Sequence, residues 1–367
     1  MRYLPFIGLL FICSFSFSQN STLVSPTDTS ATDSLVISES DTLIIPIEAQ
    51  EKYNEGVKAF QNKKYNIAVD RFSQAIAIEP RFIAPYYNRA LVRTETKDYK
   101  GAISDFDIVI ENDTLFENDA ALYQRGKAKY ESGKADEALS DYKAASKINP
   151  KNADYYYYSG LIKFEQGKFK ESVFSFNKAL IVDKKYAYAY NDRGSAKRKL
   201  EDYKGAMADY EKAIISDPSL AFAYNNLGSI KRKTGDSKGA IEEYNQAIRL
   251  KPDYYVAYNN RGSAKFELGE YTEAIKDFNK ALKIEPQYTF ALNNRATAKY
   301  KLRDYEGAIS DCDQAIKIDE KYGEAYLNRG ISKEMIRDKD GACIDWSRAA
   351  ELGINNGKTY VDNTCND

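Results

Sequence analysis

The sequence predicts an all-α protein built from stacked pairs of helices, an α–α superhelix, and three observations lead to this. Pro150, Pro218, Pro252 and Pro286 fall on a 34-residue grid. Small residues recur at three fixed positions of the grid, and a large, mostly aromatic residue recurs at a fourth. Self-similarity at a fixed period of this size is typical of repeat architectures.

Residues 1–18 have the pattern of an export signal. Arg2 provides a short basic region, and residues 4–17 form an apolar run that is too short to span a bilayer. Small residues at Ser16 and Ser18 predict cleavage before Gln19. Two alternatives are a lipoprotein signal with Cys13 as the lipidated residue and an uncleaved anchor. The bulky Ile12 disfavours the first, and the short apolar run disfavours the second.

Residues 19–48 predict a flexible acidic leader. The segment is rich in Ser and Thr, carries five acidic residues and has no Lys or Arg. It holds too little apolar surface to order itself. Its one apolar patch, residues 43–47, is expected to pack onto the first helix.

The remainder divides into nine repeats of 34 residues and a short tail. A two-residue insertion near Glu117 shifts the grid between the second and third repeats. The tail or cap comprises residues 357–367. The repeats are 49–82, 83–116, 119–152, 153–186, 187–220, 221–254, 255–288, 289–322 and 323–356.

The residues at fixed positions explain why each repeat folds as two helices. Numbered from 1 to 34, each repeat has Gly or Ala at position 8, nearly always Ala at 20 and 27, and a large residue at 24. The small residues allow two helices to cross closely while the large residue fills the space between them. A proline at position 32 ends the second helix in five repeats. Each pair leaves an apolar face that a neighbouring pair must cover.

These residues resemble the tetratricopeptide-repeat family. The sixth repeat shows the family pattern as Tyr224, Leu227-Gly228, Ala240 and Tyr244, followed by a proline. The resemblance implies a right-handed superhelix with a concave groove lined by the first helix of each repeat. It places positions 2, 5, 6, 9, 12 and 13 on that groove. This sequence departs from the family in using Tyr at position 4 and often Lys at position 11.

Positions 7 and 23 vary together. Repeat one has the charges reversed (Glu55 and Arg71), repeat four has two serines, and repeat six (Leu227 and Glu243) is the one uncompensated exception. We expect a partly buried Arg–carboxylate bond between the two helices of a repeat, with a structural role. Six repeats have Arg and Asp, as Arg89/Asp105, Arg125/Asp141, Arg193/Asp209, Arg261/Asp277, Arg295/Asp311 and Arg329/Asp345.

Three sets of residues are candidate contacts on the groove. Amides can both donate to and accept from an extended peptide backbone, cations could hold an acidic peptide, and aromatic rings could anchor apolar side chains or stack on sugars. Each set has an ordinary alternative. The asparagines could simply be a common residue at position 6, and the cations could form a solvated basic face. The aromatic residues could serve packing between repeats, which applies most to Tyr157 and Phe164. The candidates are Asn88, Asn226, Asn260, Asn294 and Asn328; Arg198, Lys199, Arg232 and Lys233; and Tyr123, Tyr130 and Tyr158.

Composition excludes several functions. The chain has 53 basic and 54 acidic residues, and this balance argues against a nucleic-acid partner. The absence of histidine removes every His-based triad and His–metal site. Residues 353–359 resemble a phosphate-binding loop but have three residues between the glycines where four are needed. The family's carboxylate clamp for chaperone C-termini is also missing. We expect no cofactor, no bound metal and no enzymatic activity.

The cysteines allow one disulfide bond, whose formation the sequence does not decide. Cys312 replaces an aromatic at position 24 and is expected to be a buried apolar residue. Cys343 and Cys365 could form a disulfide that pins the tail over the end of the array. Sequence leaves this pairing undecided because geometry determines it.

The sequence thus predicts an exported, periplasmic or extracellular scaffold, in the cell envelope of a Gram-negative bacterium, that binds a polypeptide segment in its groove. After signal cleavage it has no membrane span. The alternative is a glycan- or polysaccharide-associated module that partners an export or assembly machine. Partner identity and oligomeric state are not predicted.

Overall fold

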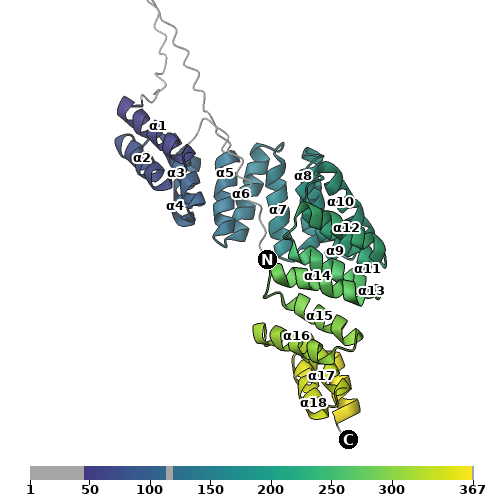
Figure 1. Cartoon of the computed structure of the whole chain (residues 1–367). Helices are drawn as coiled ribbons and strands as arrows, with labels where there is room; N and C mark the ends of the chain where they lie inside the picture. The colour runs from purple at the N-terminus through teal and green to yellow at the C-terminus, as the bar shows by residue number, and fades with distance from the viewer. Residues whose placement is uncertain (1–44, 113–118, 366–367) are drawn as a thin grey trace, which may run out of the picture. The chain divides into compact units, whose positions relative to one another are not determined.

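The computed structural model describes residues 45–112 and 119–365, and these form a tandem array of α-helices without a β-strand (Figure 1). The described array lies in one compact unit that begins at Ile45. The predicted signal peptide, most of the leader and its cleavage site lie outside the described residues. The all-α superhelix class predicted from the sequence is confirmed.

The odd-numbered helices from α1 to α17 are the first helices of the repeats, and the even-numbered helices from α2 to α18 are the second. The helices are α1 (Ile47–Gln61), α2 (Tyr65–Ile78), α3 (Ile83–Glu95), α4 (Tyr99–Asn112), α5 (Asp119–Glu131), α6 (Ala135–Ile148), α7 (Ala153–Glu165), α8 (Phe169–Val182), α9 (Ala187–Lys199), α10 (Tyr203–Ser216), α11 (Ala221–Lys233), α12 (Ser237–Leu250), α13 (Tyr255–Glu267), α14 (Tyr271–Ile284), α15 (Thr289–Lys301), α16 (Tyr305–Ile318), α17 (Gly323–Met335), α18 (Lys339–Glu351), α19 (Asn355–Tyr360) and the π-helix η1 (Val361–Cys365).

The helices follow the 34-residue numbering closely. From the second repeat to the ninth, the first helix covers positions 1–13 and the second begins at position 17. The first repeat differs because α1 begins at Ile47, inside the segment expected to be flexible. Ile47 is 80% exposed, so it does not make the expected packing contact with the first helix. The fixed φ of Pro46 and the acidic side chain of Glu48 both favour a helix start here.

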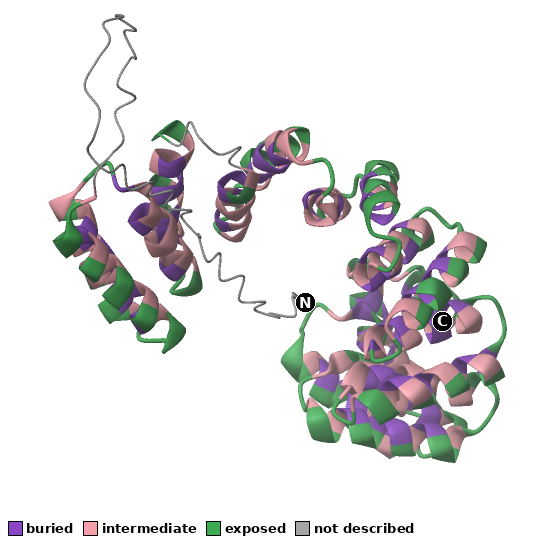
Figure 2. Ribbon diagram, turned by 90° about the horizontal axis from the view of Figure 1, so that it is seen from above, coloured by how far each residue is buried: buried purple, intermediate pink, exposed green. Residues whose placement is uncertain are grey.

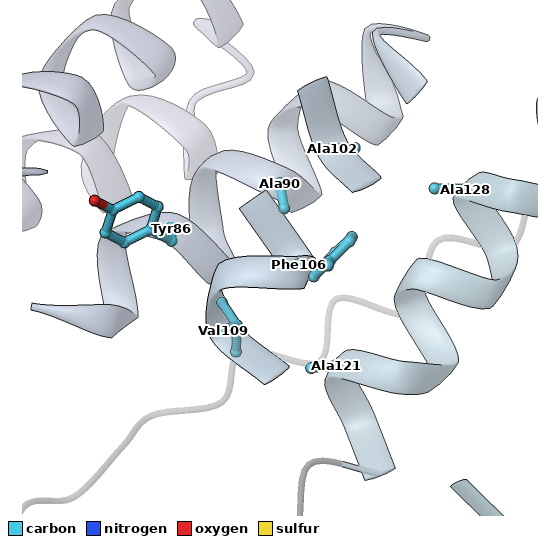
Figure 3. Close-up of a cluster of buried hydrophobic side chains, with 7 residues drawn as sticks. All are labelled: Tyr86, Ala90, Ala102, Phe106, Val109, Ala121 and Ala128. Atoms are coloured by element: carbon cyan, nitrogen blue, oxygen red, sulfur yellow. The ribbon is translucent and has the colours of Figure 1, made fainter. Parts of the chain in front are cut away.

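The core repeats with the same period. The residue at position 24 is buried in every repeat, and it is aromatic in all of them except repeat eight, which has Cys312. Phe106 of α4 shows this, since it lies in one cluster with Ala90 of α3 and with Ala121 and Ala128 of α5 (Figure 3). A Cβ at Gly330 would lie 2.6 Å from the Trp346 indole nitrogen, so this crossing requires glycine. Burial follows the sides of helices that face a neighbour, and the turns are exposed (Figure 2).

The turn within each repeat has one recurring conformation. Position 15 has positive φ in every repeat, with Gly133 and Gly235 in two of them and non-glycine residues such as Lys63, Glu201 and Arg337 in others. Where position 16 is Asp, its carboxylate accepts a hydrogen bond from the backbone N–H of a glycine at position 19. The sequence analysis missed this cap. A Cβ on these glycines would lie 2.1–2.3 Å from the carboxylate.

A buried aspartate at position 23 joins the two helices of six repeats. In repeat eight, Arg295 donates through Nε and Nη2 to the two oxygens of Asp311 at 2.8 and 2.6 Å. Asp311 is 1% exposed. Lys299, at position 11, contacts the same carboxylate at 2.9 Å. The Lys at position 11, which looked like a departure from the family pattern, is therefore the second cation on this aspartate.

The other five Arg–Asp pairs have the same geometry. Each guanidinium donates two hydrogen bonds to its aspartate, at 2.5–2.9 Å, as in Arg89/Asp105, Arg125/Asp141, Arg193/Asp209, Arg261/Asp277 and Arg329/Asp345.

The aspartates of these pairs are more deeply buried than the sequence analysis expected. It predicted partly buried pairs, whereas the structure buries the carboxylate fully and leaves the guanidinium half-buried. The reason is that position 23 is next to the buried large residue at position 24 and faces the first helix of the same repeat, where a second cation at position 11 reaches it. The six buried aspartates are Asp105, Asp141, Asp209, Asp277, Asp311 and Asp345, each at 4% exposure or less.

The second cation accompanies every one of these pairs. Asp105 contacts Arg93 at 2.7 Å, Asp141 contacts Lys129 at 2.9 Å, and Asp345 contacts Lys333 at 2.9 Å. Arg93 takes the place that Lys holds in the other five repeats. Each carboxylate is therefore held by two cations from one helix.

The same arginines also join consecutive repeats. The remaining guanidinium nitrogen, Nη1, donates to a side chain at position 25 of the preceding repeat. Arg193 donates to Asn177 at 2.6 Å, and Arg329 donates to Asp313 at 2.6 Å. One side chain therefore fixes both the crossing within a repeat and the contact between repeats.

Repeats one and six lack the Arg–Asp pair, yet each has an ion pair between its two helices. The reversed pair of repeat one forms an ion pair, with 3.0 Å between Arg71 Nε and Glu55 Oε2. Repeat six is compensated after all, because Lys231 at position 11 pairs with Glu243 at 2.6 Å. A comparison of positions 7 and 23 alone does not reveal this pair, which is why the sequence predicted an uncompensated charge in repeat six.

The last pair of helices is covered by the tail. Tyr360 of α19 stacks on Trp346 with ring centroids 4.7 Å apart. Cys365 of η1 is disulfide-bonded to Cys343 of α18. Cys312 is a buried free thiol, and burial raises its pKa to about 12. The tail lies against the end of the array.

We predict that Arg295→Met destabilises the protein by roughly 3 kcal/mol, because it leaves a buried carboxylate with Lys299 as its one remaining cation. Chemical denaturation measures this loss. Lys301→Met is the matched control, since Lys301 is exposed on the same helix. Equal stability of the two variants would contradict a role for the buried pair.

Candidate functional site

The odd-numbered helices form a shared surface, here called the A-helix face. Most first helices contact the next first helix along the chain, as α13 contacts α15 and α15 contacts α17. Between α5 and α7 the contact is made by the rings of Tyr123 and Tyr158. Neighbouring first helices therefore pack side by side. Their residues at positions 2, 6, 9 and 13 lie about one or two turns apart and share one side of each helix.

The six position-23 aspartates are not part of this face. They lie on even-numbered helices and are buried against the first helix of their own repeat, so they cannot contact a partner. Their role is structural, as the sequence analysis proposed for the Arg–Asp pairs. The aspartates excluded from the site are Asp105, Asp141, Asp209, Asp277, Asp311 and Asp345.

A row of amide hydrogen bonds runs across the A-helix face from repeat five to repeat nine. The Asn at position 6 donates through Nδ2 to the Asn Oδ1 at position 5 of the preceding repeat. The bonds are Asn226 to Asn191, Asn260 to Asn225, Asn294 to Asn259 and Asn328 to Asn293, at 2.8–3.0 Å.

The two asparagines of each bond differ in exposure. Position 5 is buried, at 4–8% exposure, whereas position 6 is half-buried. No described residue donates to the Oδ1 of Asn226, Asn260, Asn294 or Asn328. Each bond between repeats thus fixes an amide whose carbonyl oxygen remains available as an acceptor.

The first four repeats have tyrosine at position 5, and in two of them its hydroxyl bonds to position 6 of the next repeat. Asn88 donates to the Tyr53 hydroxyl at 3.0 Å, and Tyr157 donates to Asp192 at 2.8 Å. Asn88 also donates through Nδ2 to the Ala84 carbonyl. Position 6 is not Asn in repeats three to five, so the continuous row of acceptors begins after repeat five.

The three predicted aromatic anchors lie within the packing of repeats three and four. Tyr123 contacts Tyr158, with ring centroids 5.7 Å apart, and Tyr130 packs against the same core cluster. Burial raises the pKa of both Tyr123 and Tyr158. These rings fill the junction between repeats, which was the ordinary alternative considered for this set.

Asp192 occupies position 6 where other repeats have asparagine. It accepts hydrogen bonds from Tyr157 and from Asn191 at 2.8 Å each. Burial is the largest cause of its shift and raises the pKa of this carboxyl to about 6, although the two hydrogen bonds oppose the shift. Asp192 therefore titrates near neutral pH at the boundary between the tyrosine and asparagine halves of the row.

The four predicted cations divide into two kinds. Arg232 donates to Glu267 of the next repeat at 2.8 Å, and Ser237 donates to the second oxygen of that carboxylate at 2.7 Å. Arg198, Lys199 and Lys233 are exposed, and no carboxylate among the described residues pairs with them. Of the four predicted cations, three therefore have no carboxylate partner among the described residues.

The described residues contain no group of three or more carboxylate or cysteine side chains arranged to hold a metal ion. In the same part of the chain, every helix is too short or too polar to cross a bilayer.

Comparison with known families matches five segments of the array. Models described as "Tetratricopeptide repeat" match residues 255–288, 187–219 and 291–322, and a model described as "TPR repeat" matches residues 126–167 and 228–269. These segments coincide with tandem helix pairs in the structure. The chain is a tetratricopeptide-repeat protein.

Curated relatives share short stretches of these tetratricopeptide repeats. "Small glutamine-rich tetratricopeptide repeat-containing protein 2" of Saccharomyces cerevisiae is 35% identical over 106 residues, covering 29% of this chain and 30% of the relative. "Tetratricopeptide repeat protein 36" of Xenopus tropicalis is 34% identical over 103 residues, covering 28% of this chain and 51% of the relative. The chain spans about half or less of the length of these relatives.

Solved structures support the fold. A tetratricopeptide repeat protein from Parabacteroides merdae has a TM-score of 0.56 at 21% identity, covering 68% of this chain and all of that protein. PilF of Pseudomonas aeruginosa has a TM-score of 0.50 at 21% identity, covering 55% of this chain and 92% of that protein. These similarities show the fold, and the family matches and curated relatives support a protein-interaction scaffold.

We predict that Asp192→Asn stabilises the tetratricopeptide array relative to wild type as the pH rises. A carboxyl with a raised pKa contributes most to stability when protonated, and that contribution is lost as the pH rises through about 6. Asparagine stays neutral. The difference in melting temperature, variant minus wild type, should increase from pH 4.5 to pH 7.5. A difference that does not change with pH would contradict burial of the charge at Asp192.

Proposed function

We propose that this protein is a non-enzymatic scaffold that binds a polypeptide segment on its A-helix face. The observation that supports this most strongly is the row of available Oδ1 acceptors on Asn226, Asn260, Asn294 and Asn328. Backbone N–H groups of an extended segment are donors that such acceptors fit. The amides are already fixed by bonds between repeats, so binding costs little side-chain entropy.

The exposed cations favour an acidic segment. Lys199 and Lys233 occupy the same position of adjacent first helices, and Arg198 precedes Lys199. Because these charges are exposed, their attraction for a partner is screened by salt. A polypeptide held by these residues is therefore released as ionic strength rises. A neutral glycan would be far less sensitive to salt, and this separates the two functions.

We expect the variant with Arg198, Lys199 and Lys233 changed to Ala to lose a protein partner that wild type captures by proximity labelling in the native cell envelope. The matched control changes Lys204, Lys238 and Lys280 to Ala, because these three lysines are exposed on even-numbered helices. Equal capture by both variants would contradict the proposed site. Salt-independent binding to a polysaccharide array, without protein capture, would favour the glycan alternative.

We also propose that the protein is exported to the envelope of a Gram-negative bacterium. The basic and apolar pattern of residues 1–18 supports export, and a disulfide between Cys343 and Cys365 suits an oxidising compartment.

In the envelope fraction, the mature chain should begin at Gln19 and contain one free thiol, that of Cys312, when denatured without reductant. N-terminal sequencing and thiol titration measure the two quantities. Three reactive thiols, or a chain retaining residues 1–18 in the cytoplasmic fraction, would contradict export.

A further inference from the structure

A second row on the A-helix face consists of aromatic rings that the core covers only in part, since Tyr188, Phe222 and Tyr322 pack against core clusters and remain partly exposed. The rings lie at the N-terminal ends of the first helices of repeats five to nine, at positions 1 and 2 or just before the helix. They are Tyr188, Phe222, Tyr255, Tyr288, Phe290 and Tyr322, here called the ring row.

The rings of the row contact one another in two groups, Tyr188 with Phe222 and then Tyr255 to Tyr322. Tyr188 and Phe222 have centroids 5.5 Å apart. Tyr288 contacts both Tyr255 and Phe290, at 4.9 and 5.7 Å, and Phe290 contacts Tyr322 at 5.6 Å. Phe290 is nevertheless 56% exposed, and the other rings are half-buried. The row therefore presents apolar surface to solvent.

The ring row, the acceptor row and the cations lie along the same helices in a fixed order. On α11, Phe222 is followed one turn later by Asn226 and two turns further by Lys233, all on one side of the helix. On α15, Phe290, Asn294 and Lys301 repeat this order. The same position is Lys199 in α9, but it is Glu267 in α13 and Met335 in α17. The face thus has an apolar edge, a central row of acceptors and a basic edge made by Lys199, Lys233 and Lys301.

The spacing of the helices limits the conformation of a segment that follows all three rows. Packed helices lie about 8–10 Å apart. A polyproline II segment advances about 9 Å per turn of three residues and leaves its backbone N–H groups unbonded. A segment in this conformation therefore places the same side of its chain against each successive repeat.

We propose that the ring row is a specificity subsite for an acidic polypeptide segment with a three-residue period. In each triplet one apolar side chain contacts the ring row, and the backbone N–H groups donate to the asparagine Oδ1 atoms. Carboxylates of the segment face Lys199, Lys233 and Lys301 in repeats five, six and eight. This inference rests on the proposed function and adds the sequence pattern of the partner. The tilted and edge-to-face ring pairs, such as Phe290 with Tyr322 at 62°, favour insertion of apolar side chains over flat stacking of sugars.

The test is selection from a displayed library of random 16-residue peptides on the immobilised mature protein. Enriched peptides should carry an aliphatic or aromatic residue and an Asp or Glu at three-residue spacing. A synthetic peptide of the enriched sequence should bind Phe290→Ala about tenfold more weakly than wild type. Combined Lys199→Ala and Lys233→Ala substitutions should weaken binding and reduce its dependence on salt.

Phe174→Ala is the matched control, because Phe174 is 58% exposed on the even-numbered helix α8. Unchanged affinity is expected for this variant, and circular dichroism of Phe290→Ala should match wild type. Enriched peptides without a periodic apolar residue, or equal affinity for wild type and Phe290→Ala, would overturn the ring row while leaving the scaffold function intact. No enrichment on wild type would overturn both.

Discussion

The array depends on ion pairs between a buried carboxylate at position 23 and two cations, which six of the repeats have. Each of these carboxylates contacts an Arg at position 7 and a second cation, Lys or Arg, at position 11. A charge at this depth is tolerated when its partners hold it at short distance. Because the same arginine also bonds to the preceding repeat, the geometry within a repeat and the stacking between repeats are set together. These ion pairs and hydrogen bonds therefore help to set the regular spacing of the first helices on the A-helix face. The carboxylates, each 1–4% exposed, are those of Asp105, Asp141, Asp209, Asp277, Asp311 and Asp345.

Much of the fold could be predicted from the sequence because the repeat copies the same local constraints nine times. Small residues at positions 8, 20 and 27 and a large one at 24 predict a helix crossing, and the helices of the structure lie at these positions. The start of α1 was less predictable. Ile47 and Glu48 lie in a Ser- and Thr-rich composition that suggests a flexible chain, yet Pro46 favours the helix start.

The candidate site was predictable only in part, since it depends on contacts between repeats. The spacing of Asn226 and Asn260 indicates a row, but one sequence does not reveal that position 6 bonds to position 5 of the preceding repeat. The 35-residue separation of these partners is the signal that could have suggested the contact. Likewise, Tyr123 and Tyr158 resemble surface anchors until their mutual packing is seen. Arg232 looked free because Glu267 lies in the following repeat.

The covered end of α18 has a consequence for assembly. A helical array has no inherent terminus, because its last pair exposes the same kind of apolar face that stacks between repeats. Here Tyr360 occupies that face against Trp346, and Gly357 lies so close that a Cβ would be 2.7 Å from the Trp346 carbonyl oxygen. The bond from Cys343 to Cys365 fastens this cover covalently. The apolar face of α18 is therefore not available for stacking by another copy of the chain. Head-to-tail growth of a fibre from this end is blocked for as long as the disulfide stays oxidised.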